Sequence, residues 1–311
     1  MELDSHPAIN AFRYIVGFAA IIGNITMFFV IVKTKKFRKF SSNQLMALLA
    51  VADCLTGIGA LIRASFSVYS VGQGWHNYTK IFCQGANLFQ GVGITANQAV
   101  VLGMAFDRLM AVCAPQKYNH NRFKVIPYLT FVGAVIYSAI ITFVSVYGAV
   151  PTDIINLCSN GASAGPYFAF TWAIFSVVQS LTLFGVYFLS LLFVRTQLQS
   201  KGAETNTIQM RIFIWVSMIL LSQVIFWQIP LAFLITGMIL KFSPTTMSFT
   251  TLAIGLGSVM NAAASSVITF YRNAEFRQEA AMTVLKRPPV TVSATERLNA
   301  QAKQPPILAA N

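Results

Sequence analysis

The sequence predicts an all-α membrane protein, a seven-transmembrane helix bundle. Apolar residues make up 56% of the 311 residues and charged residues only 10%, whereas soluble domains are about 25% charged. A water-soluble surface needs charged side chains, so this composition argues against a soluble globule and also excludes a disordered or fibrous chain. Seven apolar stretches reach the roughly 20 residues that a membrane helix requires. None shows the alternation of a membrane β-strand, so helices are the expected elements.

Short polar connections separate the seven predicted spans. The spans lie at 11–32, 44–67, 83–112, 125–148, 166–194, 209–236 and 246–270. Each helix would satisfy its own backbone hydrogen bonds in lipid. The first span is expected to be retained, because its apolar run is too long for a secretory signal and no basic leader precedes it. Residues 1–10 precede the bundle of 11–270, and the proline-containing residues 286–311 are expected to form a disordered tail.

The basic residues predict how the chain is oriented. The chain has 22 Lys and Arg against 9 Asp and Glu, a net charge of +13. All but Arg13, Arg63, Lys80 and Lys241 lie in the tail or around the connections that follow the first, third and fifth spans. Basic residues concentrate on the cytoplasmic side, so we expect an extracellular N-terminus and a cytoplasmic C-terminus, in the plasma membrane. The positive charge then requires no nucleic-acid partner, and anionic membrane lipid is the expected counterion.

Asp53 is the clearest candidate for function within a span, because an ionisable side chain is costly in lipid and usually functional there. It lies near the middle of the span 44–67, and Asn24, Asn97 and Asn261 are candidate polar partners at a similar depth. Two interpretations fit this pattern. One is a static interhelical hydrogen-bond cluster, worth about 1 kcal/mol per bond. The other is a hydrated site that binds sodium in one conformation.

Asp107 and Arg108 are adjacent opposite charges at the end of the third span. They can pair locally, and the pair can open and free a cation for a partner. A solvated helix end is the simpler alternative. Arg108 follows Cys83 by 25 residues, which is about 37 Å of helix, so Cys83 and Arg108 are expected at opposite faces of the membrane.

The topology also selects a disulfide. Cys83 and Cys158 are expected on the extracellular side, whereas Cys54 lies in a span and Cys113 is cytoplasmic. Disulfides persist in oxidising compartments. A bond between Cys83 and Cys158 is therefore the only one that the predicted topology permits.

Several motifs occur in a fixed order along the chain. They are Gly23-Asn24, Leu49 to Asp53, Trp75, Asp107-Arg108-Leu109 followed by Pro115 and Tyr118, Phe226 to Pro230, and Arg272 to Arg277. Their order, spacing and sidedness resemble those of a rhodopsin-like (class A) G-protein-coupled receptor over about residues 11–285.

Departures from the motifs narrow the resemblance. Leu109 stands where the family has Tyr, and Trp227 lies one position further from Pro230 than usual, so Gln228 is expected at the place of the switch aromatic. The run 265–269 replaces the family's Asn-Pro-x-x-Tyr. Altered activation motifs on an intact frame resemble nematode serpentine chemoreceptors, the class sx group in particular.

The resemblance implies a short amphipathic eighth helix at 271–285 and a receptor with no cofactor and no enzymatic activity. It would bind an extracellular small molecule or peptide, in chemosensation or neuropeptide signalling, and activate a heterotrimeric G protein. The implied coupling residues are Asp107, Arg108, Leu109, Pro115 and Tyr118. The implied switch and polar core are Asn24, Asp53, Asn97, Asn261, Trp227, Gln228 and Pro230.

Three residues are candidates for the ligand pocket. Gln90 lies where amine receptors carry an acid, which argues against a biogenic amine, and Val259 replaces the lysine that holds retinal in opsins. Arg63 either extends to lipid headgroups or binds a carboxylate. Asn77, in an Asn-Tyr-Thr sequence, is a predicted glycosylation site in the first outer connection.

Other classes of protein fit the sequence less well. No phosphate-binding loop or metal-ligand spacing indicates an enzyme. A seven-helix transporter or ligand-gated channel is the alternative, although a transporter would show inverted repeats and broken helices. Mutation of Arg108 discriminates these classes, because it should abolish G-protein signalling rather than flux.

Overall fold

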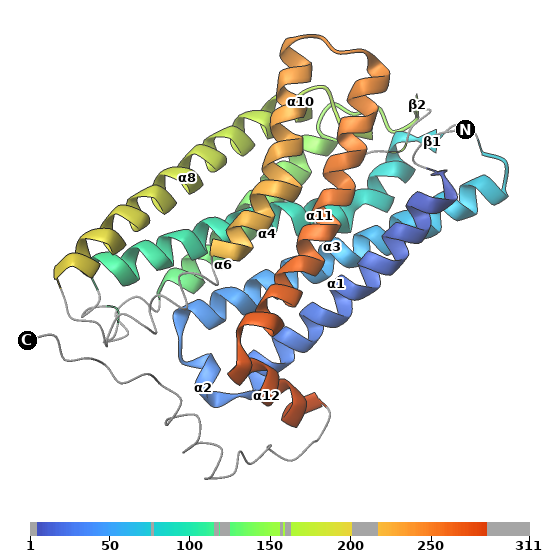
Figure 1. Ribbon diagram of the computed structural model, residues 1–311. Helices are drawn as coiled ribbons and strands as arrows, with labels where there is room; N and C mark the ends of the chain where they lie inside the picture. Colours follow the sequence, from blue (N-terminus) through green and yellow to red (C-terminus); the bar gives the residue numbers. More distant parts are fainter. Residues whose placement is uncertain are drawn as a thin grey trace, which may run out of the picture.

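The computed structural model describes residues 5–75, 78–114, 118, 125–155, 158, 163–200 and 217–284. Long helices dominate this part of the chain (Figure 1). They are α1 (Pro7–Lys33), α3 (Ser41–Gly72), α4 (Lys80–Cys113), α6 (Val125–Val146), α8 (Phe168–Ser200), α10 (Ile229–Ile239) and α11 (Pro244–Arg272). Two short helices, α2 (Lys35–Arg38) and α12 (Ala274–Val284), and a π-helix, η2 (Val224–Gln228), complete the helical elements.

Seven of the described segments are long and apolar enough to cross a membrane. The sixth is Ser217–Ile239, which contains η2 and α10. The predicted spans correspond to these segments in order. The helices of the first three spans, α1, α3 and α4, continue by several residues beyond the predicted bounds. The predicted start of the sixth span, 209–216, lies outside the described residues, as do Pro115, Asn77 and the tail 286–311.

The two ends of the bundle differ. At one end the strands β1 (Tyr78–Thr79) and β2 (Ile154–Ile155) pair antiparallel, with Tyr78 opposite Ile155, close to the disulfide between Cys83 and Cys158. We call this the disulfide end. At the other end α2 and α12 lie side by side (Figure 1), and we call it the arginine end because α4 places Arg108 there.

Side chains are distributed as expected for a protein surrounded by lipid. Large apolar residues cover the outside of the helices; Ile15, Phe143 and Leu181, for example, are each 65–70% exposed. Polar side chains such as Asn24 and Asp53 are instead fully buried between helices. Exposing apolar side chains to lipid has no free-energy penalty, and buried polar groups stabilise the contacts between helices.

Small residues allow α3 and α4 to pack closely. A Cβ atom added at Gly59 would lie 2.2 Å from the backbone nitrogen of Gln90, and one added at Gly93 would lie 2.5 Å from that of Thr56. Small residues at such contacts are typical of membrane helices, because they let two backbones approach. The close contact fixes α4, which carries residues of both ends of the bundle.

An aromatic and ionic contact holds α12 at the arginine end. The rings of Phe37 and Phe276 stack with centroids 5.6 Å apart, and both side chains are buried. Lys36 pairs with Glu275, which raises the pKa of the Lys36 ammonium through a hydrogen bond and charge attraction. The eighth helix therefore packs against the short helix that follows the first span.

Candidate functional site

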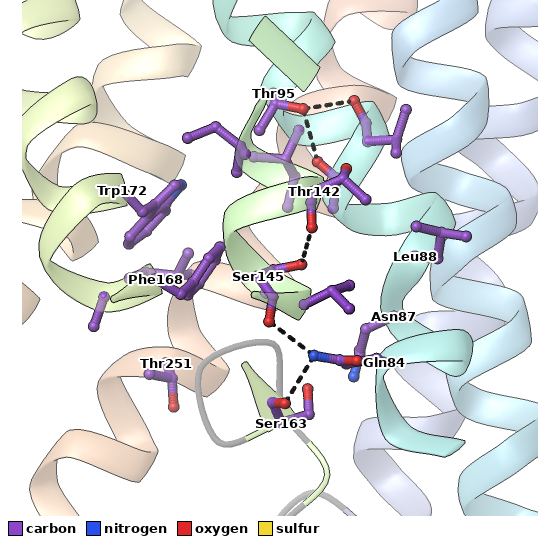
Figure 2. Close-up of a pocket in the computed structure, with 18 of the residues that line it drawn as sticks. Gln84, Asn87, Leu88, Thr95, Thr142, Ser145, Ser163, Phe168, Trp172 and Thr251 are labelled. Carbon is purple, nitrogen blue, oxygen red and sulfur yellow. Dashed lines mark hydrogen bonds between the residues drawn. The ribbon is translucent and has the colours of Figure 1, made fainter. Parts of the chain in front are cut away.

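A cavity of about 630 Å³ lies within the bundle toward the disulfide end (Figure 2). Residues from α3, α4, α6, α8, η2, α10 and α11 line it, together with the connection between α6 and α8. Its volume is typical of small-molecule sites. Among the described residues of its wall, Arg63 is the only charged one, and apolar side chains predominate.

Aromatic rings form one wall of the cavity. Phe168 and Trp172 stack with ring centroids 6.1 Å apart and an interplanar angle of 11°. The ring of Trp227 meets that of Trp172 edge to face, at 5.8 Å and 89°. Such pairs add to the stability that apolar burial provides, so this wall offers an aromatic, mainly apolar surface.

The sixth span changes its helical geometry beside this wall. Pro230 follows η2 and has no N–H to donate to the carbonyl of Phe226, four residues earlier. A π-turn holds one more residue than an α-turn and often marks a functional site. The carbonyl of Phe226 faces α11, where a Cβ atom added at Gly257 would lie 2.1 Å from its oxygen.

The π-turn determines which side chain of η2 faces inward. Trp227 is 2% exposed and packs with Ile94, Leu234 and Ile254. Gln228 instead faces α8, where its Oε1 accepts a hydrogen bond of 2.6 Å from the hydroxyl of Ser180. The extra residue of the π-turn thus compensates for the unusual spacing to Pro230, and the aromatic side chain remains at the cavity.

The connection between α6 and α8 crosses the disulfide end of the cavity. The disulfide from Cys83 to Cys158 attaches it to α4, and Lys80 pairs with Asp153 at 2.8 Å. Arg63 Nη2 donates to the carbonyl of Cys158 at 2.8 Å. The guanidinium of Arg63 is therefore buried at the cavity wall rather than on the outside of the bundle.

The other two predicted pocket residues are buried and do not line the cavity. Gln90 is buried, and its Nε2 donates to the carbonyl of Gly255 at 3.0 Å and to the hydroxyl of Ser258 at 3.3 Å. Val259 is 1% exposed. Neither belongs to the described wall; Gln90 contributes to the contact of α4 with α11, and Val259 is enclosed within the bundle.

Asp53 is the centre of a polar cluster in the middle of the bundle. Asn97 Nδ2 donates to Asp53 Oδ1 at 2.6 Å, and the hydroxyl of Ser265 donates to Asp53 Oδ2. The cluster joins α3, α4 and α11, and its carboxylate is fully buried. Buried polar groups are costly unless they are hydrogen-bonded, and here both carboxylate oxygens have partners.

Two of the predicted partners of Asp53 bond elsewhere. Asn24 Nδ2 donates to the carbonyls of Ala262 at 2.8 Å and Ala20 at 2.9 Å. Asn261 Nδ2 donates to Gln223 Oε1 at 2.6 Å. These bonds connect α1 and the sixth span to α11, so α11 takes part in each of the three polar contacts.

A second polar network lies at the arginine end. Asp107 pairs with Arg108, and its Oδ1 accepts a 2.7 Å hydrogen bond from the hydroxyl of Ser41. The hydroxyl of Tyr118 donates to Asp107 at 3.0 Å and accepts from Arg108 Nη2 at 3.0 Å. Burial raises the pKa of Tyr118 to about 12, so the phenol keeps its proton at neutral pH and donates it to Asp107.

A family model, "Serpentine type 7TM GPCR chemoreceptor Srsx", matches residues 16–284. The chain belongs to the Srsx family of serpentine chemoreceptors. Its members are seven-helix receptors, which agrees with the seven spans, the helix after the seventh span and the disulfide described above. A search among curated proteins gave no match. This Srsx chain is therefore a multi-pass membrane protein of a receptor family, as the motifs indicated.

Several residues of this Srsx receptor were not identified from its motifs. Ser265 and Ser41 bond to the two buried aspartates, and Gln84 lines the cavity. The spans of this chain contain several serines and glutamines, so only the helix packing shows which of them matter. Leu109, in the position of the family's Tyr, packs against the large apolar core.

Proposed function

We propose that the protein binds a small extracellular molecule in the cavity and then activates a heterotrimeric G protein at the arginine end. The observation that supports this proposal most is the arrangement of α4, which lines the cavity with residues 81–95 and carries Asp107 and Arg108 about 18–40 Å further along. The serpentine receptor family gives the general class.

The orientation of the proposal comes from the basic residues. The connections at the arginine end carry most of the Lys and Arg, so this end is assigned to the cytoplasm. The disulfide end, with the N-terminus, is assigned to the outside of the plasma membrane. Asn77 stays a predicted glycosylation site, and α12 is assigned to the cytoplasmic side, where the C-terminal tail is also expected.

Signal transfer would use the sixth span. A ligand against Trp172 and Trp227 changes the packing next to η2, where Pro230 already removes one helical hydrogen bond. Movement of this span at the arginine end would release Arg108 from Asp107 for contact with a G protein. The ligand shifts this equilibrium only by its differential affinity for the two states, about 1.4 kcal/mol for each tenfold change in population.

The Asp53 cluster would act as the connection between the two ends. It joins α3, α4 and α11 through Asn97 and Ser265, and the carboxylate, amide and hydroxyl oxygens are of the kind that hard cations prefer. Sodium binding at Asp53 therefore stays a prediction. A static packing role for the same hydrogen bonds is the alternative.

Filling the cavity should abolish the response to ligand. Gly85 lines the cavity, and no atom lies within 4 Å of a Cβ atom added there. We expect Gly85→Trp to reduce ligand potency at least about a hundredfold, because the indole occupies the space of the ligand. The measurement is nucleotide exchange by the co-expressed G protein, with an agonist found by screening the unmodified receptor.

Gly185→Trp is the matched control, since Gly185 also has no atom within 4 Å of an added Cβ but lies on α8 away from the cavity wall. It should leave potency and surface level unchanged. An equal response of Gly85→Trp and the unmodified receptor would mean that the ligand binds elsewhere.

Removal of the Tyr118 hydroxyl should raise signalling without ligand. Tyr118→Phe deletes the hydrogen bonds to Asp107 and Arg108 and keeps the ring. Hydrogen bonds to charged groups contribute about 1.5–3 kcal/mol, so we expect basal nucleotide exchange to rise about tenfold at equal surface level. Tyr14→Phe, at an exposed hydrogen bond with Ser65, should have no effect. A lower basal rate for Tyr118→Phe would show that the network favours the active state.

A further inference from the structure

Gln84 places a hydrogen-bond acceptor of fixed orientation at the cavity wall. Its Nε2 donates to two main-chain carbonyls, that of Ser145 at 2.9 Å and that of Ser163 at 3.0 Å. Figure 2 shows both bonds. They join α4 to the last turn of α6 through Ser145, and to the connection between α6 and α8 through Ser163. Two carbonyls can only face the NH₂ group of an amide, so the bonds decide which end of the side chain is nitrogen.

The opposite end of the amide is therefore an oxygen. Gln84 is half-buried and lines the cavity, and within the described part of the chain its Oε1 accepts no hydrogen bond. Asn87 Oδ1 is fully buried and has no partner among the described residues, whereas Gln84 Oε1 is not fully buried. It is thus an accessible acceptor that cannot rotate without losing two hydrogen bonds.

Two hydroxyl groups of the wall, those of Ser145 and Thr95, also use their protons within the protein. The hydroxyl of Ser145 donates to the carbonyl of Thr142 at 2.7 Å. That of Thr95 donates within the bundle, with the carbonyl of Gly91 at 3.1 Å and the hydroxyl of Ser138 at 2.8 Å as acceptors. These oxygens present lone pairs, so this part of the wall accepts hydrogen bonds rather than donating them.

We infer that the cavity selects an uncharged, mostly apolar molecule that carries one hydroxyl or N–H group, and that Gln84 Oε1 accepts the hydrogen bond from this group. The inference rests on the cavity being the ligand site of the proposed function. It adds the chemical class of the ligand and a residue that determines specificity.

Charged ligands fit the same wall less well. A cation would meet the guanidinium of Arg63 and no carboxylate among the described lining residues, and burial of a charge without a counter-charge is costly. A carboxylate would be attracted by Arg63, whose Nη2 already donates to Cys158, but it would face the acceptor oxygens of Gln84 and Ser145. The aromatic wall of Phe168 and Trp172 suits an apolar ring.

Four probes with one skeleton test the inference on the purified full-length receptor. They are 2-phenylethanol, its methyl ether, 2-phenylethylamine and phenylacetate, each titrated to its solubility limit at pH 7.4. Ligands that bind the folded state raise the melting temperature, which gives an apparent Kd for each probe. We expect 2-phenylethanol to bind about tenfold more tightly than its ether, because the ether leaves the acceptor without a donor. The amine and the carboxylate should bind more weakly than the alcohol.

Variants of Gln84 assign the preference to this side chain. Gln84→Met has no acceptor and similar length, and it should bring the alcohol-to-ether ratio close to one. Gln84→Lys keeps a donor for the carbonyls of Ser145 and Ser163 but has no acceptor, so it should lose the preference as well. If neither variant folds, the comparison of probes on the unmodified receptor still decides.

The outcomes separate this inference from the proposed function. Equal binding of alcohol and ether, with both abolished by Gly85→Trp, would overturn the selection by Gln84 and leave the cavity as the ligand site. Tighter binding of the amine or the carboxylate would overturn the ligand class in the same way. No shift with any of the four probes would overturn the ligand class, while the agonist response of Gly85→Trp separately tests the cavity as the ligand site.

Discussion

Arg108→Ala should abolish G-protein activation while the receptor still folds and reaches the cell surface. Arg108 is the buried cation of the arginine end, 7% exposed and paired with Asp107, and it is the group that we propose to contact the G protein. We expect ligand-stimulated nucleotide exchange to fall to the level of cells without receptor. A loss of one charge-assisted contact made only in the active complex is enough for an effect of this size.

The network of Asp107 explains why folding should survive. Removal of one partner of a buried ion pair is usually costly, because the other charge is left without a partner. Here Asp107 still accepts hydrogen bonds from Ser41 at 2.7 Å and from Tyr118 at 3.0 Å. Surface level, measured by antibody against a tagged N-terminus, should therefore stay within about twofold of the unmodified receptor.

Lys35→Ala is the matched control, because Lys35 is an exposed basic residue at the same end. It should signal normally. Normal signalling by Arg108→Ala would refute the proposed coupling site. Loss of a substrate or ion flux from Arg108→Ala, instead of loss of nucleotide exchange, would favour a transporter or a channel.

Gly257→Ala should destabilise the receptor by about 2–3 kcal/mol, the usual cost of overpacking a close contact. The added Cβ atom would lie 2.1 Å from the carbonyl oxygen of Phe226. This oxygen belongs to backbone, so it cannot move aside as a flexible side chain would. Either α11 or η2 must shift, and both border the cavity. We expect a lower melting temperature of the purified receptor and a weaker response to agonist.

Gly185→Ala provides the comparison for this prediction. Gly185 lies on α8 with nothing within 4 Å of an added Cβ atom, and replacing Gly by Ala within a helix is favourable by about 0.5–1 kcal/mol. The two substitutions should therefore have opposite signs. An unchanged melting temperature for Gly257→Ala would show that η2 does not approach α11 as closely as described.

The number, order and type of the helices could be predicted from the sequence, because lipid imposes a simple rule on them. Each span must be apolar over about 20 residues, and this alone located the seven segments. The Cys83–Cys158 bond followed from sidedness, and the structure contains it. Asp53 and Arg108 could be singled out because a charge within or beside a span is rare.

Partners of these charges could not be predicted, because hydrogen bonds depend on how helices rotate against each other. The sequence places Asn24 and Asn261 at a similar depth in their spans to Asp53. In the structure both bond to other groups, and Ser265 donates to Asp53 instead. The π-turn is a second example. The spacing of Trp227 from Pro230 indicates only that something differs, and the structure shows that an extra residue in the turn keeps Trp227 inside.

Thiol labelling of intact cells tests most directly that the cavity faces outward and Arg108 faces the cytoplasm. Cys113 is a free, exposed cysteine five residues beyond Arg108, and exposed Gln73 directly follows α3 at the disulfide end. A membrane-impermeant maleimide should label Gln73→Cys in a Cys113→Ser background on intact cells. It should label Cys113 of the unmodified receptor only after permeabilisation. Labelling of Cys113 on intact cells, with Gln73→Cys protected, would contradict the orientation and with it the proposed path from ligand to G protein.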